Sequence, residues 1–152
     1  MNNFTKALST VLLRDLDKLE QEILLYPNAQ SIWTIKGDIK NSAGNLCLHL
    51  CGNLQHFIGT ILGNSGYVRD REKEFSLKDL PASELVKLIA QTKTSISQTL
   101  AKFDVGMLAK DYPIVVFDGP MNTQYFLIHL AGHLNYHLGQ VNYHRRLIAA
   151  KD

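Results

Sequence analysis

The most informative segment of the sequence is His129-Leu-Ala-Gly-His133-Leu-Asn-Tyr-His137-Leu-Gly-Gln140. Three histidines recur in it at intervals of four residues. An α-helix turns once in about 3.6 residues, so side chains four apart lie above one another on one face. The spacing therefore predicts a helix that carries a stripe of imidazoles, and imidazole is a preferred protein ligand of zinc and nickel.

The helix that carries this stripe should run from about Thr123 to Ala150. Apolar residues at steps of three and four predict three more helices, over residues 4–26, 42–62 and 82–103. Four helices of about twenty residues indicate an all-α four-helix bundle, a fold that builds metal sites from facing helices. The length fits one domain, residues 1–152.

The first connector, residues 27–40, contains Ser31-Ile-Trp-Thr-Ile35, which we expect to be extended and to bury its tryptophan. The second, residues 64–80, is a long polar loop between the second and third helices, and such loops are often functional or mobile. Its run Arg69-Asp-Arg-Glu-Lys-Glu74 alternates in sign, which is typical of a solvated surface segment.

An irregular segment, residues 104–121, precedes the last helix and holds Ile114-Val-Val-Phe117 as a short strand-like run.

Composition narrows the function classes. With 45% hydrophobic and 20% charged residues the chain can bury a core. Sixteen basic and fourteen acidic residues give a net charge of +2, which argues against a nucleic-acid partner. No apolar run approaches the roughly 20 residues that cross a bilayer, and the first residues do not resemble a secretory signal. We therefore expect a cytoplasmic protein without a membrane partner.

A catalytic zinc-type site usually has three protein ligands and one open position. His133 and His137 are the preferred pair on the last helix, because Gly132 and Gly139 should leave room for close approach. Successive imidazoles at this spacing drift by about 40°, so one ion does not easily hold all three. His129 lies nearer the helix start and is a candidate for lining a pocket mouth.

The third ligand should come from the helix over residues 42–62, which offers His49 and His56. We favour His49, because it lies near the middle of the bundle. No Asp or Glu lies in the core of this helix or of the last one, so a histidine-only ligand set is expected. Cys47 and Cys51 should point away from His49, since residues two apart differ by about 200°, and should pack as small apolar free thiols.

Four further polar or aromatic side chains lie near the stripe in the sequence. Gln140 follows His137 by three residues and can orient its imidazole or a bound water, the alternative being a surface amide. We expect Tyr136 and Tyr143 to be packing residues and His144 to lie at the surface.

His133-Leu-Asn-Tyr-His137-Leu-Gly-Gln140 resembles the His-x3-His-x-Gly-Gln signature of the DinB/YfiT-like superfamily. Leu48-His-Leu-Cys-Gly-Asn-Leu54, followed by the charged loop Arg69-Asp-Arg-Glu-Lys-Glu-Phe75, resembles its DUF1572-type branch. The resemblance spans almost the whole chain.

This resemblance implies a four-helix bundle with up-down-down-up topology, often a homodimer. It also implies a divalent metal, typically zinc or nickel, on His49, His133 and His137. Characterised relatives include transferases and isomerases that use bacillithiol, mycothiol or glutathione, where a metal lowers the pKa of the thiol. His56 and His129 lie outside the motif.

Two classes of function remain open at this point. The first is a metal-dependent enzyme that acts on a small molecule, either as an S-transferase with a low-molecular-weight thiol or as a hydrolase that activates water. The second is a non-enzymatic, stress-associated bundle that binds a metal or a small molecule. A weaker third hypothesis is that the histidines only fill a polar core. An open coordination position beside a pocket would favour the enzyme, whereas a fourth protein ligand would favour a structural site.

Overall fold

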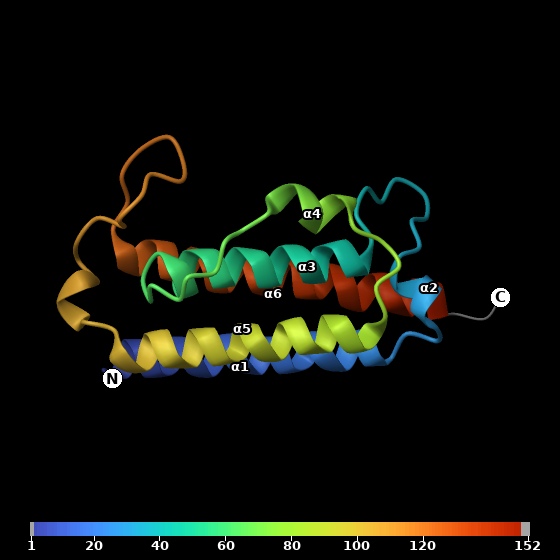
Figure 1. The fold of residues 1–152 in the computed structure, drawn as a ribbon, viewed down its shortest axis with the longest axis horizontal. Coiled ribbons are helices and arrows are strands. Elements are labelled where there is room, and N and C mark those ends of the chain that lie inside the picture. Colours follow the sequence, from blue (N-terminus) through green and yellow to red (C-terminus); the bar gives the residue numbers. More distant parts are fainter. Residues whose placement is uncertain (1, 150–152) are drawn as a thin grey trace.

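The structure is a computed structural model that describes residues 2–149. Within them the chain is all-helical, and its longest elements are the helices α1, α3, α5 and α6 (Figure 1). These span Asn3–Leu24, Ala43–Leu54, Ala82–Lys102 and Thr123–Ala149. The shorter elements are α2 (Ala29–Ile32), the π-helix η1 (Gln55–Thr60), α4 (Arg71–Ser76) and the 3-10 helix η2 (Val105–Met107).

The four long helices lie side by side. α1 packs against α5 and α6, and α3 packs against the same two helices, so α1 and α3 lie diagonally. α1 and α6 run in one direction, and α3 and α5 run in the opposite one (Figure 1). None of the helices described is both long and apolar enough to span a lipid bilayer.

The core follows the predicted apolar spacing. On α1 and α5 the buried positions recur every three or four residues, as expected for one face of a helix. They are Leu8, Leu12, Leu16, Leu19, Ile23, Leu85, Ile89, Thr92, Ile96 and Leu100. α3 differs, because every residue from Ala43 to Leu54 is buried. The short helix α4 packs on the outer side of α3 and completes its burial.

The first connector is helical over Ala29–Ile32, which overlaps the start of the extended run predicted for Ser31–Ile35. Asn28 and Ser31 form a capping box that starts α2, and this local hydrogen bonding outweighs the β-branched residues around it. Trp33 is buried as predicted, and its Nε1 donates to the carbonyl oxygen of Leu80. A Cβ at Gly44 would lie 2.6 Å from the Trp33 ring, so only glycine allows this packing.

The region between the second and third long helices also departs from expectation. The predicted helix over 42–62 is regular up to Leu54 and continues as η1 to Thr60. The loop after it contains α4, which begins with Asp70 accepting a hydrogen bond from the backbone of Lys73. The alternating charges are therefore not simply a solvated segment, since Glu74 of α4 is buried.

The segment before α6 is irregular, as predicted, but Ile114–Phe117 is not a strand. Pairing there is limited to one isolated bridge between Asp111 and Asn122. Tyr112 is buried and its hydroxyl donates to the carbonyl oxygen of Phe57, which fixes the segment to η1. Within this run Val116 packs against the core, whereas Ile114, Val115 and Phe117 remain exposed.

Candidate metal centre

The structure brings together His49 of α3 with His133 and His137 of α6. One ring nitrogen from each lies within 4.8 Å of the others. The Nε2 atoms of His49 and His133 are 3.2 Å apart. Zinc binds imidazole nitrogen at about 2.0–2.1 Å, so two ligands of a tetrahedral ion lie about 3.3 Å apart. The donor set and its spacing fit a divalent cation, and this group could hold one.

Two of the three imidazoles are oriented by an outer partner. The Nδ1–H of His49 donates to Glu74 Oε2 at 2.9 Å, and the Nδ1–H of His137 donates to Gln140 Oε1 at 2.6 Å. A proton held on Nδ1 leaves the Nε2 lone pair free for a metal. The Nδ1 of His133 is buried and makes no hydrogen bond. Gln140 thus occupies the orienting position that the sequence offered as one of two alternatives.

The sequence analysis did not identify Glu74 as part of the site. It reaches His49 from α4, and Arg69 holds the same carboxylate through two bonds, Nε to Oε1 at 2.7 Å and Nη2 to Oε2 at 2.9 Å. Burial raises the pKa of Glu74, but the hydrogen bonds from His49 and Arg69 outweigh it and lower the pKa below its ordinary value. Glu74 is therefore a carboxylate at neutral pH.

The fully buried α3 accommodates Glu74 at Gly52. A Cβ at Gly52 would lie 2.1 Å from Glu74 Oε1, so any larger residue would displace the carboxylate. A glycine in the interior of an otherwise buried helix was the signal in the sequence that could have pointed to a closely approaching group.

The protonation state of the two α6 ligands also favours metal binding. Burial, together with the neighbouring His137 and His49, lowers the pKa of His133 to about 4. Burial likewise lowers the pKa of His137, although its bond to Gln140 acts in the opposite direction. Both rings are therefore neutral at pH 7, and a neutral imidazole is the form that ligates.

His129 and His56 lie outside this group. His129 is exposed, its ring centroid is 6.2 Å from that of His133, and it packs against Phe117 and Phe126. His56 is half-buried against the ring of Phe57. The prediction that His129 lines a pocket mouth stays a prediction.

The prediction for His144 was wrong. Its ring is buried, its Nδ1 accepts a hydrogen bond from the Tyr26 hydroxyl at 2.6 Å, and its Nε2–H donates to the carbonyl oxygen of Thr34 at 2.9 Å. The residue therefore fixes the first connector to α6. Its partners lie more than a hundred residues away in the chain, which sequence spacing could not reveal.

Two other expectations about α6 also fail. Gly132 and Gly139 are exposed, and no other residue approaches their Cβ positions within 4 Å, so they do not make room for the metal pair. Tyr136 and Tyr143 are 65% and 68% exposed, so within the chain they are not packing residues. The interior of the bundle lies on the other side of the helix.

The two cysteines lie as predicted. Cys47 and Cys51 are free and buried, and neither belongs to the histidine group. Both belong to α3 and fill space in the core.

Cavities border the site through the outer partners of the histidines. Glu74 lines one of about 180 Å³ together with Cys51 and Tyr67. Gln140 lines another, of about 370 Å³, together with Lys40 and Leu46.

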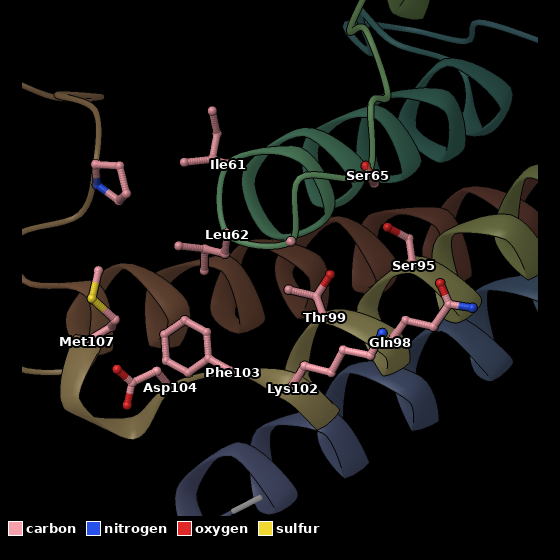
Figure 2. A pocket seen from close by; sticks show the side chains of 12 residues that line it. Ile61, Leu62, Ser65, Ser95, Gln98, Thr99, Lys102, Phe103, Asp104 and Met107 are labelled. Atoms are coloured by element: carbon pink, nitrogen blue, oxygen red, sulfur yellow. The ribbon is translucent and has the colours of Figure 1, made fainter.

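A cavity of about 430 Å³ occupies a different place, shown in Figure 2. Ile61 and Leu62 border it from the chain after η1, and Ser95 and Thr99 border it from α5. None of the three histidines lines any of these three cavities.

Comparison with known proteins adds the fold but no function. A crystal structure described as that of the conserved protein of locus from Enterococcus faecalis aligns with 99% of this chain and 99% of its own, with a TM-score of 0.80 and 17% sequence identity. At that identity the likeness shows the fold alone. No family model and no curated protein matches the chain.

Proposed function

We propose that this chain is a divalent-metal-dependent enzyme of the DinB/YfiT-like superfamily that transfers a low-molecular-weight thiol to a small electrophilic substrate. The observation that carries the proposal is the convergence of His49, His133 and His137 on one point. Within residues 2–149 no Cys, Asp, Glu or further His joins the group. Three ligands without a fourth are the arrangement of a catalytic site with an open position.

The chain's own residues prepare this position. Glu74 and Gln140 fix two of the rings, and His133 and His137 are only partly buried, so a ligand can approach from solvent. Zinc or nickel suits an imidazole set, and its positive charge would favour the thiolate form of a bound thiol. In the transfer the sulfur forms a bond to an electrophilic carbon, the leaving group departs with its bonding electrons, and the thiol proton passes to solvent.

The choice of a thiol rests on the resemblance of the His133–Gln140 segment to the superfamily signature. The same open position would also serve a hydrolase that activates water. A non-catalytic metal-binding protein is a second candidate. One observation favours it: the cavities beside the site are lined by Glu74 and Gln140, and not by the histidines themselves.

Thiol binding can be tested by optical spectroscopy of the cobalt-substituted protein titrated with glutathione, bacillithiol and mycothiol. We expect one of them to produce a thiolate-to-metal charge-transfer band that is absent in His137→Ala and retained in His129→Ala. A band together with product formation from a model electrophile supports the transferase. A band without turnover supports the binding protein, and no band with any thiol contradicts the thiol proposal.

A further inference from the structure

One buried polar side chain of α3 has no role in the site described so far. Asn53 is only 8% exposed, and its Oδ1 is buried without a hydrogen-bond partner within residues 2–149. Asn45, another buried asparagine of α3, differs: its Nδ2 donates to two backbone carbonyls, and its Oδ1 accepts from Ser42. A buried amide oxygen without a partner is costly and rare, which indicates that Asn53 serves a neighbouring group.

The register of two helices places Asn53 beside His133. α3, with its continuation η1, runs antiparallel to α6 (Figure 1). The rings of His49 and His133 have centroids 5.0 Å apart, and further along Phe57 meets Phe126 at 5.1 Å. Asn53 lies midway between His49 and Phe57, so it shares the helix face that meets α6. Side chains lean toward the N-terminus of their own helix, so the Asn53 amide and the His133 ring lean toward each other.

His133 carries a matching atom. Its Nδ1 is also buried and unpartnered, and among the side-chain nitrogens and oxygens of residues 2–149 only Ser95 Oγ on α5 shares that condition with these two. Solvent reaches neither Asn53 Oδ1 nor His133 Nδ1, so a neighbouring protein group has to satisfy each. An amide and an imidazole that lean toward each other are the natural pair, and a small rotation of either side chain would join them.

The contact between His49 and His133 determines which nitrogen of His133 holds the proton in the metal-free chain. His49 keeps its own proton on Nδ1, which donates to Glu74, so its Nε2 is an acceptor. The Nε2 of His133, 3.2 Å away, is therefore the donor, and the Nδ1 of His133 has no proton. When that Nε2 binds a metal instead, the neutral ring carries its proton on Nδ1. The Nδ1 of His133 thus needs a donor in one state and an acceptor in the other.

We propose that Asn53 is the positioning residue of His133 and serves both states. Its Nδ2 donates to the bare Nδ1 in the metal-free chain, and after a half-turn of the amide its Oδ1 accepts from Nδ1–H in the metal-loaded chain. An amide offers a donor and an acceptor of nearly equal shape, whereas the carboxylate of Glu74 only accepts and holds His49 in one tautomer. The proton changes nitrogen within a neutral ring by exchange with solvent, so the net charge is unchanged. The metal-loaded state rests on the proposed metal-dependent function, and the metal-free state does not.

Two-bond ¹H–¹⁵N correlation spectra of the full chain in a chelator show which ring nitrogen of each histidine carries the proton. In the wild type we expect the proton of His133 on Nε2. Asn53→Asp replaces the donor by an acceptor and should move that proton to Nδ1, which a purely structural role of Asn53 would not do. Asn28→Asp is the matched control, because it makes the same change at an exposed helix cap that aspartate also satisfies. A wild-type proton on Nδ1, or one that stays on Nε2 in Asn53→Asp, overturns the proposal.

Zinc affinity, measured by competition against a chelator, tests the metal-loaded state. Asn53→Leu, of similar size, should weaken binding by about 10-fold, because the Nδ1–H of His133 loses its acceptor. Asn53→Asp should tighten binding by about three-fold or more, because a charged acceptor strengthens that hydrogen bond. Affinities that shift in the same direction in both variants, or in neither, overturn the role of Asn53. A wild type that takes up no zinc contradicts the metal centre instead, and the metal-free spectra then decide on Asn53 alone.

Discussion

α1 and α5 form one half of the molecule and α3 and α6 the other, and the three histidines of the candidate metal centre all lie in the second half. α1 and α5 are ordinary amphipathic helices, and Lys93 of α5 pairs with Asp17 and Glu20 of α1 across their boundary. α3 is buried on all sides and includes His49, while α6 exposes apolar side chains. Buried polar groups and exposed apolar surfaces are the informative exceptions to the burial rule. α1 and α5 therefore support the fold, whereas α3 and α6 carry the candidate chemistry.

The largest effect expected from the supporting half is on stability. Leu12→Ala removes a fully buried side chain of α1 and should lower the free energy of unfolding by about 2–5 kcal/mol. Metal affinity measured under native conditions should stay within about two-fold, because α1 contributes no ligand. Urea denaturation and metal titration of the same sample check both values. Leu24→Ala, at a position 60% exposed, is the matched control and should cost less than about 0.5 kcal/mol. A large loss of metal affinity in Leu12→Ala would break the division between the halves.

The second prediction concerns the carboxylate that reaches α3. Glu74→Gln keeps the shape of the side chain but removes the negative charge of the carboxylate that accepts hydrogen bonds from His49 and Arg69. It should weaken metal binding by about 10- to 100-fold. Competition against a chelator of known affinity measures the change. Glu72→Gln alters an exposed acid on the same short helix and should have no comparable effect. Equal metal affinities of the Glu74→Gln and Glu72→Gln variants would show that Glu74 does not support the site.

The third prediction is a pH dependence of stability in the metal-free chain. The pKa of His133 is lowered in the folded chain from 6.5 to about 4, so the unfolded chain binds more protons between these values. The contribution to stability is therefore complete above pH 6.5 and is lost as the pH falls toward about 4. His133→Gln should flatten this part of the profile of unfolding free energy against pH, and His129→Gln, at an exposed position, should not. If His133→Gln leaves the slope of unfolding free energy against pH unchanged, the lowered pKa of His133 is contradicted.

The smallest effect is expected at the rim of α6. Gln140→Ala removes the acceptor for His137 Nδ1 at an exposed position, where a hydrogen bond contributes about 0.5–1.5 kcal/mol. Metal affinity should fall by about two- to tenfold, less than for Glu74→Gln. Gln124→Ala, also exposed on α6, is the control. A loss larger than that of Glu74→Gln would reverse the assumed order of the two outer partners.

Local periodicity was enough to predict the long helices and the stripe that holds His133 and His137, because helical spacing fixes which side chains share a face. His49 was instead chosen over His56 for its place near the middle of the bundle. It did not find Glu74 or Arg69, since their charges look the same in a sequence whether they face solvent or a buried imidazole. It misplaced His144 for a related reason: its partners Tyr26 and Thr34 come from a distant part of the chain. The tyrosines of α6 were misjudged because periodicity shows that a stripe exists, but not whether it faces the core.

The metal centre is tested most directly by elemental analysis of the purified, tag-free chain beside its His49→Ala and His133→Ala variants. We predict about one zinc or nickel ion per chain in the wild type and none in either variant, with the helical circular dichroism preserved in all three. A wild type without metal after reconstitution, or variants that retain it, would contradict the metal centre and leave the histidines as core residues.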